Sequence, residues 1–299
     1  MSAITTRTAT LCGIGAILLW STATGLIRSV TENLGPLGGA ALIYTVGACL
    51  LIAFLGRPRL RSFPPVYLIV GSVLFVSYEI CMVISLGFAN DRTQAIEISV
   101  VNYLWPCLTV LLAMVMNGQR ARLIIVPGTA IALFGISWVV SGNGLSVSHI
   151  LDNLSSNPLS YSLAVSGAFI WAFYCNVTRK YAAGKSGVTL FFVLTALMLW
   201  IRYAFSSEPP AHFTLGNSLE LLAAGAAMAC GYALWNIGIL KGNMTLLATV
   251  SYFAPVLSSA FAAVWLGTAL SLQFWQGALM VTVGSLMCWV ATRGREQAA

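Results

Sequence analysis

Glu79 and a set of tyrosine and tryptophan rings are the residues of this sequence whose types and spacing could do chemistry. Glu79 directly follows Tyr78 inside a long apolar segment, where a carboxylate can contact an ammonium group or carry a proton. Aromatic rings can stack on the ring of a solute or hold its ammonium group by a cation–π contact. These residue types indicate recognition of a small organic solute.

Catalytic and metal-binding patterns are absent from the sequence. The seven cysteines lie in apolar stretches and form no C-x-x-C pair, and the two histidines, His149 and His212, are far apart in polar connections. There is no G-x-S-x-G, H-E-x-x-H or G-x-x-x-x-G-K-[ST] pattern. We therefore expect no enzyme activity, metal, cofactor, disulfide framework or direct drive by ATP.

The composition assigns the chain to a membrane. Of its 299 residues, 59% are hydrophobic and 8% are charged, and the mean hydropathy is +0.88, whereas soluble proteins carry about 25% charged residues. So few charged residues cannot build a water-facing surface, which excludes a soluble enzyme, a nucleic-acid-binding domain and a disordered protein. The sequence predicts an all-α, polytopic membrane protein whose partners include the lipid bilayer and exclude nucleic acid.

Ten apolar runs are long enough to cross a bilayer as helices, which takes about 20 residues each. The first run exceeds the length of a signal-peptide core and lacks a clear cleavage site, so we expect it to be retained. The ten predicted spans are 8–30, 36–56, 64–89, 93–117, 120–142, 158–182, 186–206, 217–240, 244–267 and 271–292.

The basic residues sort by the side of the membrane. With ten spans, twelve of the fifteen Lys and Arg residues fall on the side of the N-terminus, and Arg28, Arg92 and Arg202 fall on the other. Positive residues accumulate in cytoplasmic loops, so both termini are predicted to be cytoplasmic. Six acids lie at or near the outer side, Glu296 lies inside, and Glu79 lies near the middle of the membrane.

The two halves of the chain repeat the same motifs in the same order. Tyr-x-x-Pro occurs at Tyr103–Pro106 and again at Tyr252–Pro255, 149 residues later. Spans 5 and 10 share a glycine pair, Gly128/Gly135 and Gly277/Gly284, also 149 residues apart. Spans 3 and 8 share a glycine and a tyrosine, Gly71/Tyr78 and Gly225/Tyr232, at an offset of 154 residues. Spans 1 and 6 share a tryptophan, Trp20 and Trp171, at an offset of 151 residues.

These matches predict one repeat of five spans in residues 1–150 and a second in residues 151–299. Because five is odd, the second repeat enters the membrane from the opposite side. Such inverted repeats are typical of secondary transporters, which bind substrate between the halves near the midplane of the membrane. Exchange of the conformations of the two halves then predicts alternating access.

Pro106 and Pro255 lie near the middle of their spans, where each removes a backbone donor and should kink the helix. They are either a pair of hinges that line a transport pathway or a pair of static kinks. Their occurrence in both halves favours the hinges.

Two acids are candidates for a role in transport. A carboxylate at the bilayer centre costs at least ~2.5 kcal/mol, so Glu79 should face the bundle interior or water. It could contact a substrate ammonium group, couple transport to protons, or be a neutral acid hydrogen-bonded between helices. Its repeat counterpart is Ala233, which confines any such role to one half. Glu97, one turn into its span, is either an outer gate or a surface acid.

Tyr and Trp residues gather in spans 1, 3, 4, 6, 8 and 9. Membrane Trp and Tyr ordinarily form interfacial belts or pack between helices, but these rings lie deeper than a belt, where their polar atoms need partners. We predict that the following residues, together with Glu79, line a cavity for aromatic or apolar solutes: Trp171, Tyr78, Tyr103, Trp105, Tyr174, Trp235, Tyr252, Trp20, Asn102 and Asn236.

Eight stretches spread over both halves carry a family resemblance: Leu11–Thr22, Ser77–Cys81, Gln94–Glu97, Asn102–Pro106, Gly167–Trp171, Trp235–Gly238, Ser251–Ser259 and Phe274–Met280. With the ten spans and the inverted repeat, they resemble the drug/metabolite transporter superfamily, in its EamA-like branch, and within it the YddG-type exporters of aromatic amino acids.

The resemblance implies export of amino acids such as Phe, Tyr and Trp across the inner (plasma) membrane by a multi-pass protein. Other metabolites, or toxic organic cations such as methyl viologen, are the alternative substrates that it implies. A nucleotide-sugar carrier shares this architecture, but no Lys or Arg lies near mid-membrane to hold an anion. The sequence leaves the oligomeric state open, a monomer included.

Overall fold

Helices make up the chain wherever the structure describes it. The computed structural model describes residues 5–58, 60–116, 121–142 and 146–292, and these residues contain no strand. The side chains of residues 236, 239, 240, 244, 245, 248, 249 and 292 are not described. The all-α prediction is confirmed for this part of the chain. Four of the basic residues counted above lie outside it: Arg59, Arg120, Arg293 and Arg295.

Seven helical segments among the described residues are long and apolar enough to cross a membrane: Thr6–Leu34, Pro36–Leu55, Tyr67–Gly87, Arg92–Met116, Pro158–Tyr181, Leu215–Trp235 and Leu272–Ala291. Shorter apolar helices are Ile125–Ser141, Val188–Ala204 and Ala254–Trp265. Each predicted span overlaps one of these segments, but the ninth, 244–267, is divided between two helices, Met244–Ser251 and Ala254–Trp265.

The helices gather into two compact units, and each unit takes helices from both halves of the sequence. The first unit, Met1–Leu60 with Ser186–Gly267, holds α1 (Thr6–Ser21), α2 (Ala23–Leu34), α3 (Pro36–Leu55), α10 (Val188–Ala204), α11 (Leu215–Lys241), α12 (Met244–Ser251) and α13 (Ala254–Trp265). The second unit, Arg61–Lys185 with Thr268–Ala299, holds the π-helical turn η2 (Tyr67–Gly71), α4 (Ser72–Gly87), α5 (Arg92–Asn102), α6 (Trp105–Met116), α7 (Ile125–Ser141), α8 (Val147–Ser156), α9 (Pro158–Tyr181) and α14 (Leu272–Thr292). The short 3-10 turn η1 (Leu60–Ser62) leads from the first unit to the second.

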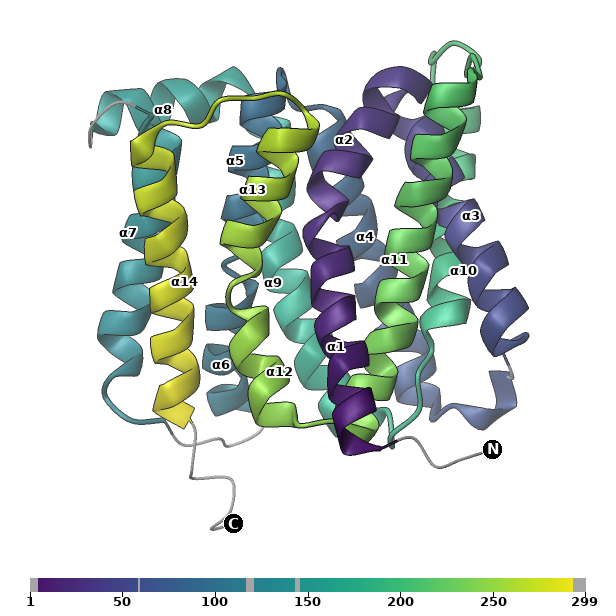
Figure 1. Cartoon of the computed structure of the whole chain (residues 1–299), viewed down its shortest axis with the longest axis horizontal. Coiled ribbons are helices and arrows are strands. Elements are labelled where there is room, and N and C mark those ends of the chain that lie inside the picture. Colours follow the sequence, from purple (N-terminus) through teal and green to yellow (C-terminus); the bar gives the residue numbers. More distant parts are fainter. Residues whose placement is uncertain (1–4, 59, 117–120, 143–145, 293–299) are drawn as a thin grey trace. The chain divides into compact units, whose positions relative to one another are not determined.

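In the first unit, α1 packs along α11, and α3 packs along α10 and α11 (Figure 1). The α1–α11 contact is close enough to require glycine, because a Cβ on Gly238 would lie 2.7 Å from the Cα of Gly13. A Cβ on Gly231, two turns earlier, would lie 2.7 Å from the Nε1 atom of Trp20. Small residues on α11 therefore bring its backbone up to α1 and to the tryptophan ring that α1 carries.

The first predicted span is interrupted between α1 and α2 at Thr22, although it contains no proline. The Thr22 hydroxyl donates to the carbonyl of Leu19 at 2.7 Å, and the Ser21 hydroxyl donates to that of Ile17 at 2.8 Å. Such hydroxyl contacts compete with the backbone ladder and often bend helices. They give a physical reason for an interruption that hydropathy does not predict.

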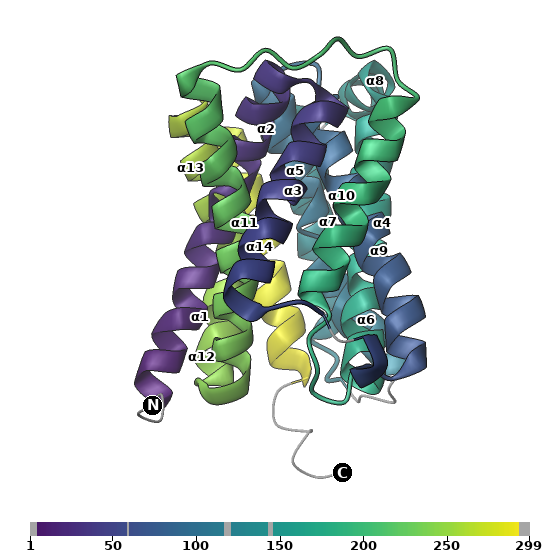
Figure 2. The same cartoon turned by 90° about the vertical axis from the view of Figure 1, so that its right-hand side faces the viewer.

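In the second unit, α4 and α6 pack against α9, and α7 packs antiparallel along α14 (Figures 1 and 2). Glycines permit the α7–α14 approach: a Cβ on Gly284 would lie 2.5 Å from the carbonyl oxygen of Gly128, and one on Gly277 would lie 2.6 Å from that of Gly135. The 149-residue offset relates Gly128 to Gly277 and Gly135 to Gly284, so it exchanges one contact for the other.

Both spans that carry Tyr-x-x-Pro are broken just before the proline. Residues 103–104 separate α5 from α6 before Pro106, and residues 252–253 separate α12 from α13 before Pro255. A proline cannot donate to the carbonyl four residues earlier, and its ring clashes with that carbonyl. The kinks expected at the two prolines are therefore present as breaks in the helices.

The structure adds a helix, α8, that an apolar-run criterion does not find. It lies between the fifth and sixth predicted spans and crosses the end of the second unit at which α7 ends (Figures 1 and 2). With ten residues, α8 is too short for a span.

We predict that Gly284→Ala destabilises the protein, because its new Cβ would meet the carbonyl oxygen of Gly128 at 2.5 Å. Overpacking of this kind costs about 1–3 kcal/mol, which should appear as a lower melting temperature of the purified protein in detergent. Gly15→Ala is the matched control, since the nearest atom to its Cβ, Cδ1 of Leu234, would lie at an ordinary 3.8 Å. Equal melting temperatures for the two variants would contradict the close α7–α14 contact.

Candidate functional site

An aromatic cluster joins α4, α6 and α9 in the second unit. Trp171 stacks on Tyr174 of the same helix with ring centroids 4.8 Å apart, and its ring lies 4.5 Å from that of Tyr78 on α4. Phe75 and Trp105 complete this Trp171 cluster, with ring centroids 6.0 and 6.4 Å from that of Trp171. Tyr78, Trp105 and Trp171 are half-buried, so part of each side chain remains exposed.

Asn102, the last residue of α5, supplies polar contacts to the Trp171 cluster and is 3% exposed. Its Nδ2 atom donates to the carbonyl of Ala164 on α9 at 3.2 Å, and its Oδ1 atom accepts from the hydroxyl of Tyr78 at 3.4 Å. Gly167 leaves room for the amide, since a Cβ there would lie 3.1 Å from Nδ2. Asn102 thus gives the tyrosine hydroxyl the partner that it needs in apolar surroundings.

Glu79 lies at the centre of α4, one residue after Tyr78, and is 1% exposed. Its carboxyl group is therefore withdrawn from the lipid-facing surface, where a charge would be most costly. Glu79, whose carboxyl group could bind an ammonium group or a proton, is on the same helix as Tyr78 of the Trp171 cluster.

A second aromatic cluster joins α1, α10 and α11 in the first unit. The ring centroid of Trp20 lies 5.0 Å from that of Tyr232 and 5.3 Å from that of Trp235, and Phe192 lies 5.5 Å from Tyr232. We call these residues the Trp20 cluster. The Nε1 atom of Trp20 is buried and has no hydrogen-bond partner among the described residues. An acceptor on a bound solute would remove the cost of this buried donor.

Two residues of each cluster are related by the motif offsets of the sequence. Trp20 corresponds to Trp171 at an offset of 151 residues, and Tyr78 corresponds to Tyr232 at an offset of 154. Each tryptophan contacts the tyrosine of its own unit. The pair α1 and α11 in the first unit therefore matches the pair α9 and α4 in the second.

The predicted solute-binding residues are divided between the two units. Trp20, Trp235 and Tyr252 belong to the first unit, whereas Tyr103 and the residues of the Trp171 cluster belong to the second. Tyr103 and Tyr252 lie in the two helix breaks and are half-buried. The side chain of Asn236, on α11, lies outside the described residues.

Rings that the sequence analysis did not assign to the site also belong to the clusters. Phe75 lies three residues before Tyr78, which puts both on the same face of α4. Tyr232 is the repeat counterpart of Tyr78. Helical spacing and the repeat offset are therefore the signals that could have identified them.

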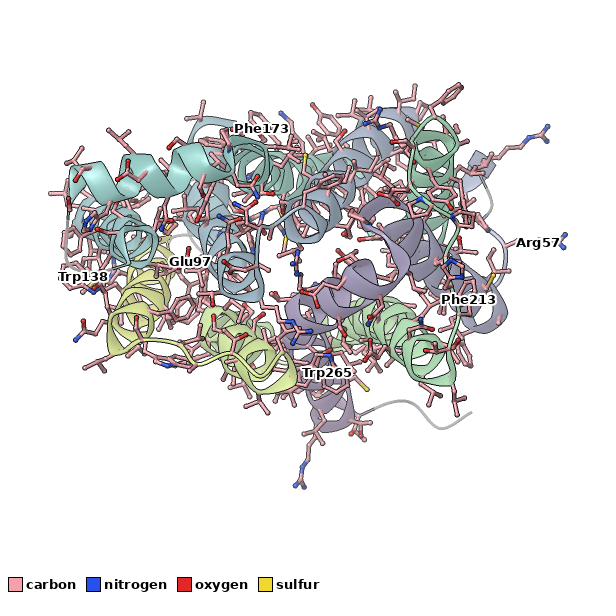
Figure 3. All side chains as sticks on the ribbon, turned by 90° about the horizontal axis from the view of Figure 1, so that it is seen from above. Arg57, Glu97, Trp138, Phe173, Phe213 and Trp265 are labelled. Carbon is pink, nitrogen blue, oxygen red and sulfur yellow. The ribbon has the colours of Figure 1, made fainter. Side chains whose placement is uncertain are left out.

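Glu97, the candidate outer gate, accepts a hydrogen bond from the hydroxyl of Tyr161 at 3.0 Å. This contact links α5 to α9 within the second unit and leaves Glu97 half-buried. Figure 3 shows Glu97 among the helices, whereas Trp138 and Phe173 lie at the edge of the unit. Tyr161 thus fixes the position of the carboxylate.

The chemistry of these groups is noncovalent recognition. The rings can stack on an aromatic solute, and Asn102, Glu79 and the Trp20 indole can form hydrogen bonds to polar groups on it. Within the part of the chain that the structure describes, no three His, Cys, Asp or Glu residues lie close enough together to hold a metal ion.

The apolar helices indicate a multi-pass membrane protein. The model of the EamA-like transporter family matches the sequence twice, over residues 7–141 and 158–290. The chain belongs to this family, which is part of the drug/metabolite transporter superfamily.

Two curated relatives, each named aromatic amino acid exporter YddG, match nearly the whole chain. The protein of Salmonella typhimurium is 55% identical over 98% of this chain and 100% of its own length, and that of Escherichia coli is 54% identical over 97% and 99%. A protein of the same name from Ancylobacter novellus is 30% identical over 84% of this chain and 86% of its own. A crystal structure at 27% identity has a TM-score of 0.66 and covers 97% of this chain and 99% of that chain.

We predict that Asn102→Leu lowers the melting temperature of the purified protein more than Tyr78→Phe does. Asn102→Leu removes the 3.2 Å bond to Ala164 and leaves the Tyr78 hydroxyl without its acceptor, at a cost of about 1–3 kcal/mol. Tyr78→Phe removes only the weak 3.4 Å bond. If Tyr78→Phe destabilises as much as Asn102→Leu, the amide does not anchor the cluster.

Proposed function

We propose that this chain is a secondary transporter that exports aromatic amino acids across the inner membrane. The observation that carries the proposal is the identity of 55% and 54%, over nearly the whole chain, to two proteins named aromatic amino acid exporters. Membership of a transporter family supports the same conclusion.

The Trp171 cluster supports the substrate class. Its partly exposed rings offer stacking surfaces to the side chain of phenylalanine, tyrosine or tryptophan. An amino acid also carries an ammonium group, which the buried carboxyl of Glu79 can attract and the ring faces can hold by cation–π contact. In the first unit, the buried Nε1 donor of Trp20 suits a carboxylate oxygen. Trp235, Asn236, Tyr103, Trp105 and Tyr252 are proposed to line the same transport pathway.

The proposed topology has ten spans with both termini in the cytoplasm. Seven long and three shorter apolar helices occur among the described residues, and they coincide with the ten apolar runs of the sequence. Counted with ten spans, twelve of the fifteen basic residues fall on one side, which supports the orientation.

The proposed mechanism is alternating access between two inverted repeats, residues 1–150 and 151–299. The family model matches once in each half. Contacts related by the repeat offset support the symmetry: the Trp–Tyr pairs of the two clusters and the glycine pairs of α7 and α14. When the two repeats exchange conformations, an inward-open state becomes an outward-open state of similar energy.

Pro106 and Pro255 are the proposed hinges of this exchange, since the helix breaks beside them interrupt the backbone ladder at equivalent places in both halves. Glu97 is the proposed outer gate. Its hydrogen bond to Tyr161 would hold α5 against α9 while the gate is closed.

We predict that liposomes containing the purified protein move labelled phenylalanine or tryptophan without ATP, and that Trp171→Ala slows this flux. The expected loss is about 2- to 10-fold, because a ring–ring contact contributes about 0.5–1.5 kcal/mol. Trp171→Phe, which keeps a ring, should restore part of the flux. The control is Phe173→Ala on the same helix, since Phe173 is 39% exposed and lies outside the cluster.

No flux above that of empty vesicles for any aromatic amino acid would overturn the export proposal. Flux of methyl viologen without amino acid flux would identify organic cations as the substrate class. Unchanged flux in monodisperse Trp171→Ala would limit Trp171 to packing.

We predict that Glu79→Gln abolishes the dependence of flux on a pH gradient if Glu79 carries the coupled proton. Glutamine has nearly the same shape but no titrating group, so packing around the 1% exposed side chain is kept. The measurement compares flux with and without an imposed pH gradient in the wild-type protein and the variant. A wild type that ignores the gradient excludes proton coupling at Glu79, and reduced affinity without loss of gradient dependence assigns it to the substrate ammonium.

A further inference from the structure

The helix α8 is joined by short connections to two helices that run through the second unit. Residues 142–146 link it to the end of α7, and Asn157 alone separates it from the start of α9. Both neighbouring helices have exposed apolar side chains. Leu133 of α7 is 50% exposed, and Leu159 of α9 is 53% exposed. If α7 and α9 cross the bilayer, connections this short hold α8 at the level of the membrane surface.

The sequence of α8 is amphipathic. Its apolar residues are Val147, Ile150, Leu151 and Leu154, which follow the i, i+3, i+4, i+7 spacing of one helical face. The remaining positions carry serine, histidine, aspartate and asparagine. Such a pattern is ordinarily formed by a helix that buries its apolar face against the protein.

Most of the apolar face of α8 is not buried against the protein. Val147 is 73% exposed, Leu151 is 59% exposed and Leu154 is 37% exposed, and no residue of α8 counts as buried. The contact with α7 is instead polar, since Nδ2 of Asn153 donates to the carbonyl of Val140 at 2.7 Å. The side of α8 that carries Asn153 faces the protein, while the neighbouring apolar side faces outward.

The geometry points to α8 as an interfacial helix that lies in the membrane surface with Val147, Leu151 and Leu154 inserted among the lipids. The polar face of His149 and Asp152 then faces water, because these residues lie on the opposite side of the helix. Helices of this kind insert about 5–10 Å below the headgroup boundary. In the proposed topology, this is the outer leaflet.

The charge of α8 defines the lipid chemistry that it fits. The helix contains no Lys or Arg and one acid, Asp152, so it offers nothing that would attract anionic headgroups. We therefore expect insertion to depend on apolar contact with acyl chains and to occur in vesicles of phosphatidylcholine alone. Another exposed apolar residue, Leu159, lies three residues after the end of α8, near the start of α9.

Site-directed spin labelling tests this assignment on the full chain. Val147→Cys and Leu151→Cys report on the apolar face, and His149→Cys and Asp152→Cys are the matched controls on the polar face. Each is made in a Cys49→Ser background, since Cys49 is the native cysteine classed as exposed. In phosphatidylcholine vesicles, labels on the apolar face should collide more with oxygen than with a water-soluble nickel chelate, and labels on the polar face should show the reverse.

Higher nickel access at all four positions would overturn the proposal, since α8 would then lie in water. Labels at positions 147 and 151 that are shielded from both reagents would also overturn it, because protein, such as a second copy of the chain, would cover the face. A requirement for anionic lipid would contradict the chemistry assigned to the helix. None of these outcomes depends on whether the protein moves amino acids.

Discussion

The backbone of a chain inside hydrocarbon finds no water for its polar groups, and this constraint determines the rest of the structure. It explains why the described residues form helices and no strand. It also requires that backbone groups left unpaired at a helix interruption find other hydrogen-bond partners. At Thr22 a hydroxyl donates to a backbone carbonyl, and at Tyr103 the N–H still reaches the carbonyls of Ser99 and Val100 at 3.2 and 3.1 Å. The interruptions are tolerated because these local groups form hydrogen bonds at the breaks.

The same scarcity of polar partners shapes the two aromatic clusters. An aromatic ring can be buried between membrane helices without any polar contact, but the hydroxyl or indole N–H that it carries needs a hydrogen-bond partner. In the second unit Asn102 accepts from Tyr78, whereas in the first unit Trp20 keeps a buried donor for which no partner is found among the described residues. The Tyr78 hydroxyl of one cluster thus has an acceptor, whereas the Trp20 indole of the other has none among the described residues.

The sequence predicts the helices well and their interactions only in part. Hydropathy over about 20 residues is a strong signal, so the apolar runs coincide with the observed helices. The helix α8 gives no such signal, because ten residues with alternating polar positions look like a connection. The repeat offset relates Trp20 to Trp171 and Tyr78 to Tyr232, but sequence alone does not say that each tryptophan touches a tyrosine; that contact depends on how α1 packs along α11 and α9 along α4. Phe75 belongs to the Trp171 cluster, and its only sequence signal is the spacing of three residues to Tyr78 on the same helix.

The compact units differ from the sequence halves for a reason that the α7–α14 pair makes clear. These helices are the last apolar segments of the two halves, and each presents glycines to the backbone of the other. An offset of 149 residues exchanges the Gly128–Gly284 contact for the Gly135–Gly277 contact. A helix that packs against its own repeat counterpart necessarily joins both halves in one unit. A new side chain at either glycine pair would therefore disturb a contact that joins the two halves of the sequence.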